Sequence, residues 1–123
     1  MEIVRLPKIE DPRGNLSFIE YGPAGACPFE IERVYWIYDV PAGAVRHSRA
    51  LSHTREMIVA MSGSFDVAIR RPGEPEQRIH LCRSYTAVVV EPGWMRTIDN
   101  FSTNSVAMVL ASAPYDPEEY TYG

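Results

Sequence analysis

Turn-forming residues recur along this whole chain at short intervals, and they leave room only for short extended segments. The 123 residues include ten prolines and eight glycines, spread from end to end. Between them lie segments rich in β-branched and aromatic residues, such as NLSFIEY, ERVYWIYDV, SFDVAIRR and SVAMVLASA. No segment keeps the helical apolar period of about 3.6 residues for about ten residues. The sequence therefore predicts an all-β protein.

The turns between these segments indicate how the strands are connected. RRPGEPEQ, between Ile69 and Ile79, carries Pro72-Gly73 and predicts a hairpin. DPRGN at 11–15 predicts a second tight turn. We expect about eight to eleven antiparallel strands arranged as a jelly roll, in a single domain over residues 1–123.

Charge and composition exclude several classes of function. The net charge of -4 and the isoelectric point near 5.3 disfavour nucleic-acid binding, which needs a basic face. No apolar run reaches the roughly 18 residues of a membrane helix, and no N-terminal stretch resembles a signal peptide. Cys27 and Cys82 fit no paired motif, and we expect two buried free thiols. These features predict a cytoplasmic protein with no membrane association.

Two segments have the spacing of cupin motifs. In GAVRHSRALSHTREMIVAMSG at 43–63, Gly43, Glu56 and Gly63 stand where the first cupin motif has glycine, glutamate and glycine. Positions 49 and 51 would be its two histidines. The segment PGWMRTIDN at 92–100 resembles the second motif, in which position 96 would be the third histidine. This resemblance implies a cupin fold, that is, a double-stranded β-helix jelly roll.

The residues at these positions do not suit a metal. Arg49, Leu51 and Arg96 replace the three histidines, and Glu56 alone keeps a ligand type. A guanidinium group has no lone pair to offer a metal ion, and a leucine side chain has no donor atom. We therefore expect neither a metal nor another cofactor.

The two arginines leave three interpretations open. Arg49 and Arg96 could bind a phosphate, pyrophosphate or carboxylate group through charge-assisted hydrogen bonds. Arg49 could instead pair with Glu56 as an internal salt bridge. Both side chains could also reach solvent at strand ends.

Five segments together resemble the sugar 3,4-ketoisomerase family of cupins: DPRGNLSFIE, PFEIERVYWIYDVP, VAMSGSFDVAI, DNFSTNSVAMVLAS and YDPEEY. They extend from Asp11 to Tyr120, nearly the whole chain. The resemblance implies a metal-independent enzyme that binds a dTDP-linked keto sugar in its barrel and forms a homodimer with exchanged strands. Its reaction would move the carbonyl of dTDP-4-keto-6-deoxyglucose from C4 to C3 through an enediol.

The chain departs from this family at the catalytic motif, Arg-Gly-x-His-Ala-His, whose histidine pair moves the protons. Arg46 and Ala50 match the motif. Arg49 and Leu51 occupy the two histidine positions, and His47 occupies the glycine position. The resemblance therefore assigns no catalytic role to positions 49 and 51.

Tyr35 and His47 are the candidates for proton transfer. Strand alternation would place His47 on the same face as Arg49, although a histidine at a strand end is often simply solvated. The resemblance places Tyr35 in the pocket, where the alternative is a core aromatic with a satisfied hydroxyl. The predicted substrate-binding residues are Arg33, Arg46, Arg49, Glu56 and Arg96.

Two functions follow from these observations. The first is a nucleotide-sugar 3,4-ketoisomerase that works by acid/base tautomerisation. The second is a binding protein that keeps the nucleotide-sugar pocket, or a pocket for another anion, without turnover.

Overall fold

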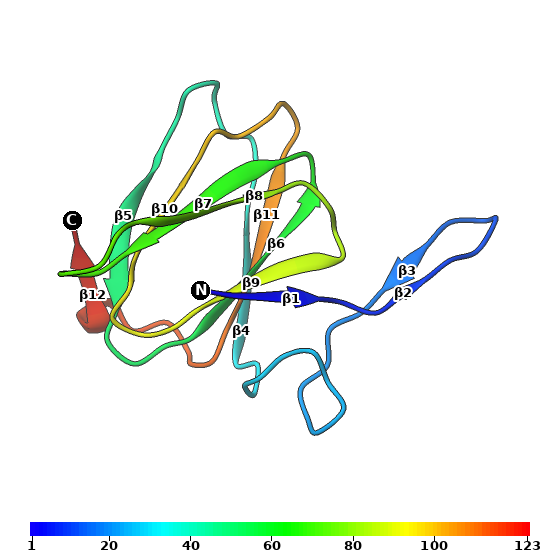
Figure 1. The fold of residues 1–123 in the computed structure, drawn as a ribbon, viewed down its shortest axis with the longest axis horizontal. Coiled ribbons are helices and arrows are strands. Elements are labelled where there is room, and N and C mark those ends of the chain that lie inside the picture. The colour runs from blue at the N-terminus through cyan, green and yellow to red at the C-terminus, as the bar shows by residue number, and fades with distance from the viewer.

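Twelve short strands form nearly all of the regular structure (Figure 1). The computed structural model describes the backbone of residues 1–123 and every side chain except that of His47. The strands are β1 (Glu2–Arg5), β2 (Lys8–Ile9), β3 (Leu16–Ser17), β4 (Arg33–Ile37), β5 (Arg46–Leu51), β6 (Glu56–Ser62), β7 (Phe65–Arg70), β8 (Gln77–Leu81), β9 (Thr86–Val90), β10 (Met95–Asp99), β11 (Val106–Ala111) and β12 (Tyr120–Tyr122). A short 3₁₀ turn, η1 (Pro117–Glu119), precedes β12.

The strands form two five-stranded antiparallel sheets. One sheet has the order β1-β9-β6-β11-β4 and the other β12-β5-β10-β7-β8. β7 and β8 pair as the hairpin that the Pro72-Gly73 turn predicts. The all-β, jelly-roll prediction is confirmed, with one strand more than the expected range.

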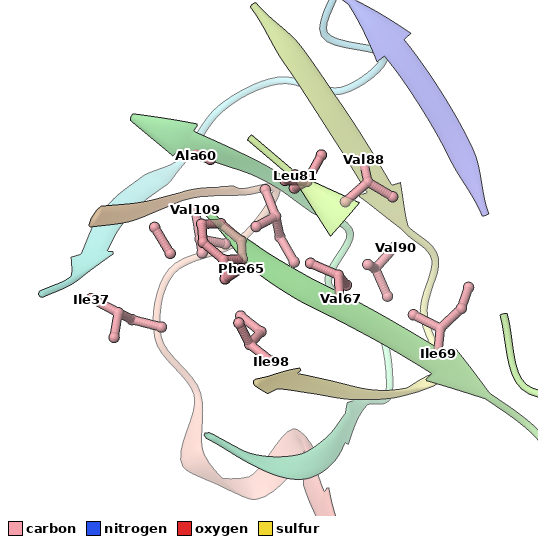
Figure 2. Packing of buried hydrophobic residues seen from close by; sticks show 12 residues of the cluster. Ile37, Ala60, Phe65, Val67, Ile69, Leu81, Val88, Val90, Ile98 and Val109 are labelled. Atoms are coloured by element: carbon pink, nitrogen blue, oxygen red, sulfur yellow. The ribbon is translucent and has the colours of Figure 1, made fainter. Parts of the chain in front are cut away.

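The main hydrophobic core lies between the two sheets (Figure 2). Phe65, Val67 and Ile69 extend along β7 and meet Val88 and Val90 from the opposite sheet. A second cluster on the outer side of β6 and β9 is covered by Leu6, Cys27 and Phe29. Because residues 57–60 of β6 are buried on both faces of the sheet, they form a continuous apolar run, MIVA, rather than an alternation.

The N-terminal hairpin, β2–β3, projects from the body of the molecule as an arm (Figure 1). The predicted turn at 11–15 closes it, and the Gly14 amide donates to the Asp11 carbonyl at 2.9 Å. Ile9, Leu16 and Phe18 are exposed on this arm and beside it.

Two further expectations have different outcomes. Cys27 is buried, whereas Cys82 is exposed at the end of β8, so the prediction of two buried thiols is wrong for Cys82. As far as the chain is described, none of its helices is long and apolar enough to cross a membrane.

Candidate active site

Three strands place a polar residue inside the barrel, two positions before an apolar core residue. The apolar members all belong to the main core. The pairs are Tyr35 and Ile37 on β4, Glu56 and Ile58 on β6, and Arg96 and Ile98 on β10. Since residues two apart on a strand share a face, each polar residue points inward directly beside the core. One end of the barrel interior is therefore polar.

The Glu56 carboxylate is the centre of this polar end and is only 3% exposed. The Tyr35 hydroxyl donates to its Oε2 at 2.5 Å, and Nη2 of Arg49 donates to the same oxygen at 3.1 Å. Nη2 of Arg96 donates to Oε1 at 3.3 Å. Both arginines also donate to the Tyr35 hydroxyl oxygen, at 2.5 Å from Arg49 and 3.2 Å from Arg96.

These contacts decide between the interpretations of the two arginines. Arg49 forms the internal salt bridge with Glu56, and Arg96 is buried and forms another. The interpretation that both side chains reach solvent at strand ends is wrong. A guanidinium group has more donors than these bonds use, so the salt bridges leave anion binding open.

The network fixes the charge of its members. Burial disfavours the charged form of Glu56, but Arg96 and Arg49 outweigh it and lower the pKa of this carboxyl group. Burial, together with the Glu56 charge, raises the pKa of Tyr35 well above its usual range. Tyr35 is therefore neutral at physiological pH, and one carboxylate faces two guanidinium groups. The polar end carries a net positive charge.

An irregularity in β5 brings a further arginine to the same place. Arg96 pairs with Arg49 while Ile98 pairs with Arg46, so three steps along β5 match two along β10. This is the signature of a β-bulge. As a result Arg46 and Arg49, three residues apart, line one cavity. The register change falls in the stretch that includes His47, whose side chain lies outside the described structure, so the predicted placement of His47 beside Arg49 stays a prediction.

The polar end opens into a cavity of about 850 Å³. Arg33 stands on its wall, with its Cζ 5.4 Å from the centre of the Tyr35 ring and 5.6 Å from that of Tyr115. Nε and Nη2 of Arg33 are buried and have no hydrogen-bond partner within the described structure. Buried donors normally have partners, so these two indicate a place for an acceptor from a ligand or water.

The structure brings most of the predicted site residues together. Arg33, Tyr35, Arg46, Arg49 and Arg96 all line the cavity. Glu56 does not line the cavity, but it contacts Tyr35, Arg49 and Arg96, which do. The seventh predicted residue, His47, has a side chain outside the described structure.

Three further tyrosines belong to the wall, and none of them was among the predicted site residues. Tyr115, Tyr120 and Tyr122 line the cavity from the C-terminal segment. The sequence feature that could have indicated these tyrosines is their close spacing in the segment YDPEEYTY. Leu51 does not line the cavity: it is buried, beside a small void below the floor.

The donor set at the former cupin metal position does not fit a metal ion. Both oxygens of Glu56 already accept hydrogen bonds from cationic groups. Its neighbours Arg49 and Arg96 supply no lone pair. A divalent cation placed there would be repelled by the positive charges of Arg49 and Arg96. These residues therefore do not suit a metal-dependent reaction.

The geometry defines a cupin-like jelly roll with an arginine- and tyrosine-lined cavity. The family model described as "FdtA: WxcM-like, C-terminal" matches residues 1–123. The TDP-4-oxo-6-deoxy-alpha-D-glucose-3,4-oxoisomerase of Aneurinibacillus thermoaerophilus is 34% identical over 119 residues, covering 97% of this chain and 84% of the relative. The chain belongs to the FdtA/WxcM-like family of sugar 3,4-ketoisomerases, as its sequence resemblance implied.

Solved structures agree with this family. A variant of the 3,4-ketoisomerase QdtA from Thermoanaerobacterium thermosaccharolyticum, in complex with TDP-4-keto-6-deoxyglucose, matches with a TM-score of 0.91 and 28% identity, over 98% of this chain and 85% of QdtA. The WlaRB TDP-quinovose 3,4-ketoisomerase of Campylobacter jejuni matches with a TM-score of 0.91 and 32% identity, over 99% and 92%. The RmlC epimerase of Mycobacterium tuberculosis, 18% identical over 98% and 66%, shares the fold with a TM-score of 0.81.

The Glu56→Gln substitution tests the central role of the carboxylate. The folded-state pKa of Glu56 is depressed, so its stabilisation is present above its unfolded pKa and is lost as pH falls through the folded value. We expect Glu56→Gln to lower the free energy of unfolding by about 3 kcal/mol near pH 7, because two buried guanidinium groups lose their counter-charge. The difference should shrink as the pH falls below about 4.

Urea denaturation between acidic and neutral pH measures this effect. Glu74→Gln, which removes an exposed carboxylate paired with Arg71, is the control and should change little. If Glu56→Gln lowers the free energy of unfolding by the same amount at every pH, the loss comes from the shape of the new side chain and not from the missing charge.

Proposed function

We propose that this protein is a dTDP-4-keto-6-deoxyhexose 3,4-ketoisomerase that works by metal-independent acid/base chemistry. The observation that carries the proposal is the contact of two buried guanidinium groups with one neutral tyrosine hydroxyl at the cavity floor. Such preorganised donors suit a developing enediolate. Cys27 and Cys82 are free, which supports a cytoplasmic location as part of this proposal.

Charge on the cavity wall supports a diphosphate-linked substrate. Arg33 has two buried donors without partners, and Arg46 lies on the same cavity. A guanidinium group can donate two parallel hydrogen bonds to two oxygens of one phosphate group. With the diphosphate at Arg33 and Arg46, the sugar would extend toward Tyr35 and Arg49 on the floor.

The proposed reaction conserves atoms and electrons within the sugar. A base takes the C3 proton, the C3–H electrons form a C3–C4 double bond, and the C4 carbonyl oxygen becomes an enediolate oxygen. Arg49 and Arg96 would stabilise that negative charge. The 3-hydroxyl then loses its proton as C3 becomes the carbonyl, and C4 and its oxygen each gain one proton.

The side chains at the site suit different roles in proton transfer. The raised pKa keeps Tyr35 protonated, so its one hydroxyl proton, which Glu56 accepts in this structure, would be available to the enediolate oxygen once that hydrogen bond is exchanged. Glu56 is a poor base, since its pKa is lowered and both of its oxygens accept hydrogen bonds. His47, whose backbone belongs to β5, is the proposed base, because imidazole is the side chain whose ordinary pKa, about 6.5, best suits proton transfer near neutral pH.

Incubation with dTDP-4-keto-6-deoxyglucose in deuterated water tests the proposed function. The wild-type protein should form a 3-keto product that carries deuterium at C4, observed by NMR and mass spectrometry. Tyr35→Phe should lower the rate by at least about a hundredfold while dTDP binding is kept, because it removes one general acid. Tyr38→Phe, a cavity residue outside the network, is the matched control.

Binding without turnover would contradict the proposed isomerase function. If the wild-type protein binds the dTDP-sugar but returns it unchanged, without deuterium at C3 or C4, the protein is the binding module and not an isomerase.

Arg33→Ala tests the diphosphate position. We expect dTDP affinity to fall by roughly tenfold or more, as for the loss of a charged hydrogen bond, measured by titration calorimetry. Arg83→Ala removes an exposed arginine that is not among the residues lining the cavity, and should leave affinity unchanged. Equal affinity for Arg33→Ala and wild type would place the diphosphate elsewhere.

The proposal includes a homodimer with exchanged N-terminal arms. Val34, Trp36 and Met61 form an exposed apolar patch on the outer face of the β4-β11-β6 region, and Trp36 is 60% exposed. An apolar groove of about 530 Å³ lies between this face and the chain at 15–19. The projecting arm carries its own exposed apolar side chains, so the arm of a second copy suits the patch.

Trp36→Glu tests the dimer. Sedimentation at micromolar concentration should show a dimer for the wild type and a monomer for Trp36→Glu, because the substitution buries an unpaired charge in the interface. Glu76→Lys, in the exposed β7–β8 turn, changes charge away from the patch and should remain dimeric. A monomeric wild type would refute the exchange.

A further inference from the structure

Glu119 is a buried carboxylate outside the catalytic network. It is 4% exposed, and its Oε1 accepts from the backbone amides of His53 and Thr54 at 3.2 and 3.1 Å. The Thr54 hydroxyl donates to Oε2 at 2.6 Å. A buried carboxylate with three donors is a specific anchor, because losing it leaves buried amides unpaired. Glu119 thus ties the C-terminal segment to the turn that follows β5.

This anchor holds a strand too short to be stable by itself. β12 has three residues and pairs with β5, with Tyr120 opposite Leu51 and Tyr122 opposite Arg49. Hydrogen bonds fix both of its ends: the Ser52 amide donates to the Glu119 carbonyl at 3.2 Å, and the Gly123 amide to the Ser48 carbonyl at 3.0 Å. A short edge strand frays readily unless its ends are held.

The anchored segment covers the cavity arginines with aromatic rings. The Arg49 Cζ lies 4.9 Å from the centre of the Tyr120 ring, and the Tyr115 ring covers Arg33. Tyr120 also contacts Tyr115 edge-on at 5.8 Å and stacks near Tyr122 at 6.1 Å. The rings contact the guanidinium groups in cation–π geometry, which favours the orientation that these groups have here.

We propose that Glu119 is a positioning residue of the ligand site: by fixing residues 115–123 on β5 it holds Tyr120 over Arg49 and orders the cavity wall. The inference rests on the proposed function, since it takes a dTDP-linked sugar as the ligand of this cavity. Glu119 acts through Tyr120 and does not itself line the cavity. Ordering the wall before binding lowers the entropy cost of binding.

A double-mutant cycle with dTDP as the probe tests this. Glu119→Ala should weaken dTDP affinity about tenfold, and Tyr120→Leu should do the same, because either change removes the Tyr120 contact that holds Tyr115 over Arg33, the proposed diphosphate position. The double variant should be no weaker than the worse single variant, since both act through one contact. Glu118→Ala, on the same 3₁₀ turn but exposed, is the matched control and should bind like the wild type.

Two further readouts separate positioning from simple destabilisation. Thermal denaturation establishes that each variant is folded at the temperature of titration. Hydrogen exchange should be faster at the amides of 120–123 in Glu119→Ala but unchanged in Tyr120→Leu. In turnover, Glu119→Ala should raise KM more than it lowers kcat.

The contrary results distinguish a failure of the positioning role of Glu119 from a failure of the proposed function. A folded Glu119→Ala variant that binds dTDP like the wild type, or effects that add in the double variant, would overturn the positioning role alone. If the wild-type protein binds neither dTDP nor the dTDP-sugar, the proposed function fails and this inference fails with it.

Discussion

One buried carboxylate organises the polar half of this barrel. Glu56 lies at the start of β6, within reach of side chains from β4, β5 and β10. Without its charge, Arg49 and Arg96 would be two like charges in a largely buried place with no counter-charge, and such an arrangement is costly. With it, both guanidinium groups are paired and donate to one hydroxyl. The arrangement of the active site therefore depends on a salt-bridge network that also belongs to the folded core.

The fold was readable from the sequence because most strands carry a periodic signal. β4, β7, β8, β10 and β11 alternate or run apolar between turn residues, and they lie where expected. β2, β3 and β12 have two or three residues each, too few for any period to show. They form because a partner strand is placed beside them, which is tertiary information.

The site was predictable in its members but not in its contacts. Spacing singled out positions 49, 56 and 96, and resemblance added Tyr35 and two arginines. The distances were needed to show that Arg49 pairs with Glu56 and to exclude the interpretation in which both arginines reach solvent. The β-bulge between Arg46 and Arg49 cannot be seen in the sequence, and with it both arginines line the same cavity. Glu119 and its tyrosines were missed because a buried anchor in an acidic tail looks like a solvated charge. In this family member, Arg49 and Leu51 replace the catalytic histidine pair while the frame around them is kept.

We place the reaction of the keto sugar at the network of Glu56, Tyr35, Arg49 and Arg96. A crystal structure with dTDP-4-keto-6-deoxyglucose bound is the decisive measurement. We expect the C4 carbonyl oxygen within about 2.6–3.2 Å of the Tyr35 hydroxyl, with an arginine Nη also in hydrogen-bond contact with that oxygen. A bound sugar that points away from the network, with no polar contact to Tyr35, Arg49 or Arg96, would show that the reaction does not take place there.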